Sequence, residues 1–168
     1  VGEQMDEMLR LHTDLDARAR RERCIRMLED VGISRAAERL ASYPHQFSGG
    51  MRQRVVIAIA MLAQPKLVIA DEPTTALDVT IQAQILKLMR HQIREHGASM
   101  ILITHDLAVV SEIADHITVL YCGKVVERGA TDDVIRRPAH PYTRGLIDSI
   151  PNPEHRTARL SQIPGAVP

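Results

Sequence analysis

The sequence has no net charge and few cysteines, and each of these shortages excludes a class of protein. Lysine and arginine together number 21, as do aspartate and glutamate, so the formal net charge of the 168 residues is +0 at pH 7. No overall basic field therefore favours nucleic acid or an anionic membrane surface as a partner. The two cysteines, Cys24 and Cys122, lack CxxC spacing. This separation argues against a zinc site or a disulfide framework and predicts two buried, reduced thiols.

Long apolar runs and a signal peptide are also missing. No run approaches the roughly 18 residues that a membrane-spanning helix needs. Residues 1–12 have neither the charged start nor the apolar middle of a signal peptide. We therefore expect a cytosolic protein. Because the chain begins with Val1 and closes on a Pro/Gly-rich stretch, residues 160–168, we also expect a fragment at both ends.

The first third of the chain has the pattern of amphipathic helices in a globular domain. Apolar residues recur at three- and four-residue spacing through residues 3–40, and Gly32 is expected to end the second helix. Pro44 breaks the pattern, and Ser48 is predicted to cap the next helix. The apolar face of that helix would consist of Met51, Val55, Ile59 and Leu62. Arg52 and Arg54 could meet either the core or solvent, and the sequence favours a solvated helix face for them.

The middle of the chain predicts a βαβ unit. Residues 66–73 and 99–106 contain short apolar runs bounded by polar residues, which are typical of buried parallel strands. Residues 79–96 are predicted to form the crossover helix, with Asp78 as its N-cap and Gly97 at its end. The residues of this helix that face the sheet would be Ile81, Ile85, Leu88, Met89 and Ile93.

The last third predicts a hairpin and two short helices. Residues 115–129 contain two strand-like runs about a Cys-Gly turn, which indicates an antiparallel hairpin. Thr131 is expected to cap a short helix. Residues 140–151 would supply one more helix before an irregular tail.

Polar side chains follow both predicted parallel strands, where functional groups gather in such sheets. Asp71 and Glu72 follow the first strand, and Thr104, His105 and Asp106 follow the second. A strand-end aspartate can hold Mg²⁺, and the next carboxylate can polarise a water for attack on a phosphate. Alternation along extended backbone would give Asp71 and Glu72 different targets. Taken singly, Asp71 and Asp106 could equally be helix or turn caps, and His105 could be structural or could contact a phosphate.

The tripeptide Ser48-Gly49-Gly50 is a second candidate site. The N–H groups and the positive dipole at the start of a helix bind anions, and glycines let a phosphate approach closely. The tripeptide is equally consistent with an N-cap followed by a flexible turn.

Three stretches together resemble the motifs of ABC-type ATPases. In order, "FSGGMRQRV", "LVIADEPTTALD" and "ILITHD" resemble the signature motif, Walker B with its D-loop, and the switch-histidine loop. The resemblance implies an α/β chain that is the C-terminal part of a P-loop NTPase fold. A helical subdomain would occupy residues 1–65, a partial nucleotide-binding core residues 66–130, and a truncated C-terminal extension residues 131–168.

The resemblance implies a role for each residue of the signature. Ser48, Gly49 and Gly50 would contact the γ-phosphate of an ATP held by an opposing subunit. Phe47 and Met51 depart from the commonest LSGGQ form, and Met51 lacks the amide of the usual glutamine.

The resemblance also assigns the strand ends. Asp71 would serve Mg²⁺, Glu72 would act as general base or polarise water, Asp78 would bridge the dimer, and His105 would be the switch residue. The sequence contains no Walker A loop, GxxxxGK[ST], and no Q-loop before the helical region. We therefore expect the isolated chain to bind MgATP weakly at best, with no meaningful turnover.

Residues 136–151, "RRPAHPYTRGLIDSIP", narrow the family further. They are similar to the C-terminal extension of ATPases that energise dipeptide and oligopeptide importers, a group with nickel and glutathione relatives. The resemblance implies a second ATP-binding subunit and membrane permeases as partners, at the inner face of the cell membrane, with no nucleic acid. Two alternatives stay open at this point: an ABC ATPase of translation or DNA repair, and a non-catalytic regulatory or interaction module.

Overall fold

The computed structural model describes residues 1–75 and 77–149. They form two compact units, one of residues 1–103 and one that begins at Thr104, each with a hydrophobic core of its own. Within the described ranges, no helix is long and apolar enough to cross a membrane. Helices, parallel strands and antiparallel strands occur together, so the α/β class is confirmed. The expected functional division at residues 65 and 130 stays a prediction.

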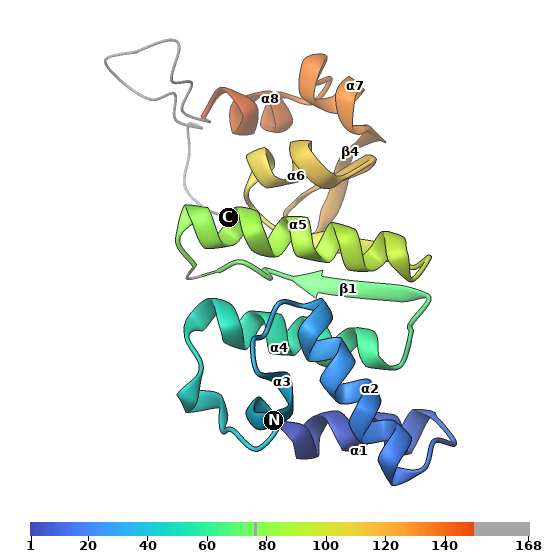
Figure 1. Cartoon of the computed structure of the whole chain (residues 1–168). Helices are drawn as coiled ribbons and strands as arrows, with labels where there is room; N and C mark the ends of the chain where they lie inside the picture. Colours follow the sequence, from blue (N-terminus) through green and yellow to red (C-terminus); the bar gives the residue numbers. More distant parts are fainter. Residues whose placement is uncertain (76, 150–168) are drawn as a thin grey trace. The chain divides into compact units, whose positions relative to one another are not determined.

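The first unit begins with a group of helices that confirms the pattern of residues 3–40. They are α1 (Gly2–His12), α2 (Ala17–Asp30), α3 (Ala36–Arg39), the 3-10 helix η1 (Pro44–Gln46) and α4 (Gly49–Leu62). The Asp16 side chain accepts a hydrogen bond from the N–H of Ala19 and so caps α2. Gly32 follows that helix at φ +79°, a left-handed conformation that favours glycine. The helices α1, α2 and α4 pack against one another (Figure 1).

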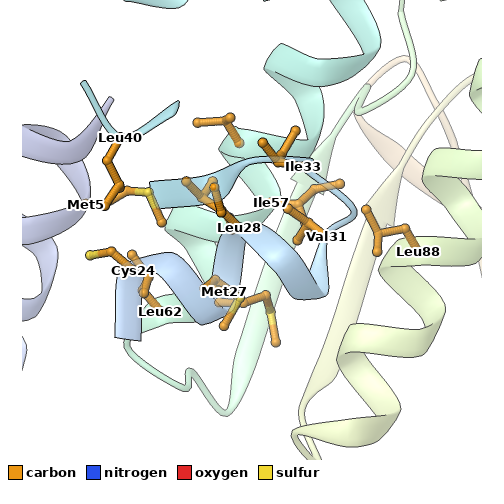
Figure 2. Packing of buried hydrophobic residues seen from close by; sticks show 14 of the residues in the cluster. Met5, Cys24, Met27, Leu28, Val31, Ile33, Leu40, Ile57, Leu62 and Leu88 are labelled. Carbon is orange, nitrogen blue, oxygen red and sulfur yellow. The ribbon is translucent and has the colours of Figure 1, made fainter. Parts of the chain in front are cut away.

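Apolar side chains from these helices form the core of the first unit (Figure 2). Met5 and Leu9 lie one turn apart on α1, and Leu28 of α2 and Leu62 of α4 are likewise fully buried. Burying one such side chain contributes about 1.5–3 kcal/mol relative to leaving it exposed. The buried residues of α4 are Val55, Ile57, Ala58, Met61 and Leu62. The helix therefore buries more than the single face that was predicted, because it packs against α1, α2 and α5.

The predicted βαβ unit is confirmed. Strand β1 (Leu67–Asp71) pairs in parallel with β2 (Ser99–Ile103), and α5 (Val79–Glu95) connects them. Asp78 caps α5, since its Oδ1 accepts from the N–H of Ile81 at 2.9 Å. Gly97 ends the helix region at φ +60°.

The prediction that both strands are buried is wrong for the described residues. Side chains alternate between the two faces of a strand. One face packs against the core through Val68, Ala70, Met100 and Leu102. On the other face, Ile69 is 65% exposed, and Ile101 and Ile103 are about half exposed. Within the part of the chain that the structure describes, helices therefore cover only one side of this small parallel sheet.

The second unit is built on the predicted hairpin. Its elements are α6 (Leu107–Ile113), β3 (His116–Tyr121), β4 (Lys124–Ala130), α7 (Thr131–Arg136) and α8 (Pro141–Asp148). Strands β3 and β4 are antiparallel, and their register shifts between Val119 and Leu120. Ile117 and Val119 of β3 and Val134 of α7 form its core. The predicted helix of residues 140–151 is confirmed over 141–148, whereas its last two residues and the tail lie outside the described residues.

Two details of the sequence prediction are wrong. Cys24 is buried as expected, but Cys122 is exposed because it lies in the hairpin turn, at φ +48°. Thr131 does not cap α7 with its side chain. Its hydroxyl donates to the carbonyl of Ala114 at 2.6 Å, and Ala130 occupies the N-cap position.

Candidate functional site

The first part of the candidate site is the start of α4. Ser48 has extended backbone, and its Oγ accepts from the N–H of Met51 at 3.3 Å, so its predicted role as N-cap is confirmed. The first N–H groups of a helix have no carbonyl partner inside it. Those of Gly49 and Gly50 therefore belong to a turn that is suited, by its dipole and its donors, to an anion.

The structure brings this turn to the start of α5. A Cβ atom on Gly50 would lie 2.8 Å from Cγ2 of Ile81, and a Cβ atom on Gly49 would lie 3.7 Å from Cδ2 of Leu77. Asp78 lies between these two contact residues in the sequence and caps α5. Two predicted parts of the site, the Ser48–Gly50 turn and the Asp78 cap, are thus neighbours within one unit.

Asp71 and Glu72 stand where β1 ends. Asp71 is the last residue of the strand, is exposed, and pairs in register with Ile103. The N–H of Glu72 donates to the carbonyl of Ile103 at 2.9 Å, and Glu72 Oε2 accepts from the Thr75 hydroxyl at 3.1 Å. The carboxylate of Glu72 is therefore oriented by a side chain of the following turn.

The backbone of Glu72 corrects one argument from the sequence. Its φ is +46°, in the left-handed region that side-chain-bearing residues rarely adopt. Strand alternation therefore ends at Asp71, and a left-handed turn, rather than extended backbone, directs the Glu72 side chain. Such a conformation costs of order 1–3 kcal/mol and is held by its surroundings, here by the hydrogen bonds to Ile103 and Thr75.

His105 and its neighbours begin the second unit. The Asp106 carboxylate accepts from the N–H groups of Ala108 at 2.9 Å and Val109 at 3.4 Å, which confirms the simpler alternative that Asp106 is a helix cap. The hydroxyl of Thr104 accepts from the N–H of Asp106 at 3.1 Å. His105 is exposed between them. It follows β2 by two residues, as the sequence predicted, and belongs to a different unit from Asp71 and Glu72.

The donors at the end of β1 fit magnesium by their chemistry. In the described residues, no group of three or more His, Cys, Asp or Glu side chains is arranged to share a metal ion. Mg²⁺ commonly takes one or two carboxylates and completes its octahedron with water and phosphate oxygens. The exposed carboxylate of Asp71 meets that requirement without further protein ligands.

Arg54 is a contact that the sequence did not reveal. Its guanidinium donates from Nη1 to the carbonyl of Val31 at 2.7 Å and from Nη2 to Oε1 of Gln84 at 3.3 Å. It therefore joins α4 to the end of α2 and to α5. The sequence left the surroundings of Arg54 open, and in the structure its guanidinium contacts these two elements. Arg52 is exposed, as predicted. No local signal distinguishes the two arginines, since the partners of Arg54 lie 23 and 30 residues away.

A pocket of about 220 Å³ lies among α4, β1 and α5, and its lining includes Asp71 and Gln92. Gln92 is only 3% exposed. Its Oε1 has no hydrogen-bond partner among the described residues. Because the rest of the lining is largely apolar, this amide is a polar group in an apolar setting.

The chain matches known proteins along its whole length. Residues 2–75 match the family described as ABC transporter, and residues 126–168 match the oligopeptide/dipeptide transporter C-terminal region. Over 168 residues the chain is 52% identical to the oligopeptide transport ATP-binding protein AppD of Bacillus subtilis and 51% identical to its dipeptide transport ATP-binding protein DppD. It is 49% identical to the oligopeptide transport ATP-binding protein OppD of Salmonella typhimurium.

Each match covers the whole of this chain. The share of the relative that is covered is 51% for AppD, 50% for DppD and 50% for the Salmonella OppD. The chain thus spans about half the length of the curated relatives it matches. The motifs around Ser48 and Asp71 fall in or beside the first matched region, and α7 and α8 fall in the second. Residues 2–75 thus resemble the ABC transporter family, and over its whole length the chain is similar to the ATP-binding proteins of oligopeptide and dipeptide transport.

Proposed function

We propose that this chain is part of the ATP-hydrolysing subunit of an ABC importer for peptides and that it couples hydrolysis to transport. One observation supports this proposal above the others. The capped Ser48–Gly50 turn lies against the capped start of α5, in the same unit whose parallel strand ends in Asp71 and Glu72. In our proposal the turn supplies donors for a phosphate of a nucleotide held by an opposing subunit, and the strand end supplies carboxylates for a metal and a water at the nucleotide of its own subunit.

The residues of α4 would bind phosphate oxygens. In our proposal, the N–H groups of Gly49 and Gly50 and the hydroxyl of Ser48 face the γ-phosphate of a nucleotide held by an opposing subunit. Glycine at both positions keeps side chains out of the approach path. MgATP, when bound, would supply the phosphoryl group and the metal that neutralises its charge.

The carboxylates at the end of β1 would divide two tasks. Asp71 would hold Mg²⁺, and Glu72 would accept a proton from the attacking water or polarise it. The hydroxyl of Thr75 donates to Oε2 of Glu72 and so helps to hold the carboxylate in place for this role. Positioning of this kind is a large part of phosphoryl-transfer catalysis.

Asp78 and His105 would each have a further role. One oxygen of Asp78 already accepts from the N–H of Ile81, so a contact across the dimer would use its second oxygen. His105 would be the switch residue that contacts a phosphate oxygen or orients the water, at the start of the second unit.

We propose further that the complete protein works with a second ATP-binding subunit and with membrane permeases. It would lie in the cytoplasm, attached to the inner face of the membrane through those permeases. The matches over residues 2–75 and 126–168 and the transport proteins they identify support this part of the proposal.

ATP turnover by the complete gene product, purified with its permeases, tests the proposal. Glu72→Gln removes the proposed base at nearly constant size, and we expect turnover to fall by about 100-fold or more while nucleotide still binds. Glu95→Gln is the matched control, because Glu95 is exposed at the far end of α5. Equal turnover in the two variants would overturn the role of Glu72. Absence of turnover in the unmodified protein would overturn the proposal as a whole.

A further inference from the structure

The starts of α4 and α5 meet at a contact that depends on Gly50. A Cβ atom at this position would lie 2.8 Å from Cγ2 and 3.9 Å from Cδ1 of Ile81. The first distance is well inside the usual separation of two carbon atoms, about 3.5–4.0 Å. Ile81 therefore occupies the space that a side chain on residue 50 would need.

Ile81 has little freedom to move away. It is β-branched and lies in the first turn of a helix, where one χ1 rotamer is strongly preferred. Its backbone N–H is bound by the Asp78 carboxylate at 2.9 Å. Its side chain also packs against the core of the first unit. The residue that meets Gly50 is thus fixed on its backbone side by the same Asp78 that caps α5.

Gly49 provides an internal comparison. A Cβ atom there would lie 3.7 Å from Cδ2 of Leu77, which is an ordinary van der Waals contact at the end of a flexible side chain. Neither Gly49 nor Gly50 has a positive φ, so conformational freedom does not explain why glycine is needed. The structure therefore separates two adjacent glycines: alanine fits at residue 49 and collides at residue 50.

From these contacts we infer that Ile81 is a positioning residue for the phosphate-binding turn of α4. It acts at Gly50, where an added Cβ would lie 2.8 Å from Cγ2 of Ile81, and its backbone N–H is held by Asp78. A shift of the first turn of α5 therefore moves Asp78 and the Ser48–Gly50 turn together. This inference rests on the proposed function, because that proposal gives the Ser48–Gly50 turn its phosphate-binding role. The packing of Ile81 at Gly50 does not depend on it.

The contact is tested first in the 168-residue chain without nucleotide. Hydrogen exchange at the N–H groups of Met51 and Arg52 reports opening of the first turn of α4. We expect Gly50→Ala to speed this exchange by about tenfold and Gly49→Ala to leave it nearly unchanged. Adding Ile81→Ala to Gly50→Ala should restore slow exchange, because it removes the colliding atom. The inference is wrong if Gly50→Ala behaves like Gly49→Ala, or if Ile81→Ala brings no recovery.

The functional part is tested by ATP turnover of the complete gene product. Ile81→Val keeps Cγ2, whereas Ile81→Leu loses that branch at the same side-chain volume. We expect kcat to fall by about tenfold in Ile81→Leu with KM little changed, since misplaced binding groups slow a reaction steeply. Ile81→Val should stay near the unmodified rate. Val79→Ala is the control for trimming α5, because Val79 is 84% exposed.

The two tests fail in different ways. Turnover that is equal in Ile81→Leu and Ile81→Val would overturn the positioning role and leave the proposed function standing. A complete gene product without turnover would overturn the proposed function, and the exchange experiment would still decide whether Ile81 holds Gly50.

Discussion

Gln92 shows how one buried amide can weaken a small core. Its Oε1 is buried without a hydrogen-bond partner among the described residues, and such a group costs about 1–3 kcal/mol. We predict that Gln92→Met, which keeps the length of the side chain and removes the amide, raises the free energy of unfolding by about 1 kcal/mol. The urea midpoint at unchanged slope is the measurement. Gln84→Met is the control and should bring no gain, because Gln84 Oε1 accepts from Arg54. A lower midpoint for Gln92→Met would contradict the prediction.

The two thiols differ because only one is enclosed by the core. Cys24 is 2% exposed, and burial raises the pKa of its thiol, so little reactive thiolate forms. Cys122 is exposed in the hairpin turn. A thiol reagent such as dithionitrobenzoate should therefore label one cysteine rapidly in the folded chain and the second only after unfolding. Cys122→Ser should abolish the rapid phase; rapid labelling that persists in this variant would assign the reactive thiol to Cys24.

Residue-level roles could be predicted where the signal is local. Ser48, Asp78 and Asp106 were each predicted to cap a helix or turn, and each does so through hydrogen bonds within three residues. Thr131 was misassigned and the surroundings of Arg54 were left open, because their partners lie 17 to 30 residues away in the sequence and give no periodic signal. The catalytic and binding roles of the site residues stay predictions.

At the scale of elements, Glu127 ties strand β4 to the start of α8. Its two carboxylate oxygens accept from the N–H groups of Ala139 at 2.8 Å and His140 at 3.1 Å. The nearby hydroxyl of Thr143 and these two N–H groups hold the pKa of Glu127 below its ordinary value. The Thr143 hydroxyl is buried and has no partner with hydrogen-bond geometry among the described residues. Glu127 thus supplies the acceptors for backbone groups that the approach to α8 would otherwise leave unpaired.

This link predicts a pH dependence. Because the folded state lowers the pKa of Glu127, its charged form stabilises the second unit at every pH above about 4.3, the ordinary value for glutamate. That contribution is lost as the pH falls through the lowered pKa. Glu127→Gln should speed hydrogen exchange at the N–H groups of Ala139 and His140 at neutral pH. In this variant, acidification should also change the protection of these two N–H groups less than it does in the unmodified chain. Asp132→Asn, at an exposed pair with Arg136, is the control and should change neither.

Helices and strands were predicted well where the hydrophobic periodicity and the capping or turn residues indicate the same limits. Residues 79–96 combine a helical period with a cap at Asp78 and a glycine at residue 97, and α5 follows these limits within a residue. The hairpin was predictable from a Cys-Gly turn between two strand-like runs, and both residues have positive φ there. That α4 is buried on more than one face was not predictable, because this burial depends on helices that are distant in the sequence.

At the scale of the whole molecule, the prediction that was wrong concerns the burial of the parallel sheet in the first unit. Apolar residues on both faces of β1 and β2 indicate a parallel sheet that is covered on both sides. The structure covers the face of Ala70, whereas within the described residues Ile69 is 65% exposed and Ile101 and Ile103 are about half exposed. The apolar runs of β1 and β2 thus indicated correctly that both faces of the sheet are apolar. Which face this chain buries is seen only in the structure.

The exposed sheet face should make the isolated 168-residue chain associate. Contiguous apolar surface on a parallel sheet gains about 25 cal/mol for each Å² removed from water, so pairing of two such faces is favourable. We predict that Ile69→Thr with Ile101→Thr lowers the average mass measured by light scattering and reduces binding of an apolar dye, while β-branching preserves the strands. Val79→Thr is the control, because Val79 is equally apolar and 84% exposed but lies at the start of α5 rather than on the sheet. A monodisperse monomer in the unmodified chain, or an equal effect of Val79→Thr, would show that the sheet face does not drive association.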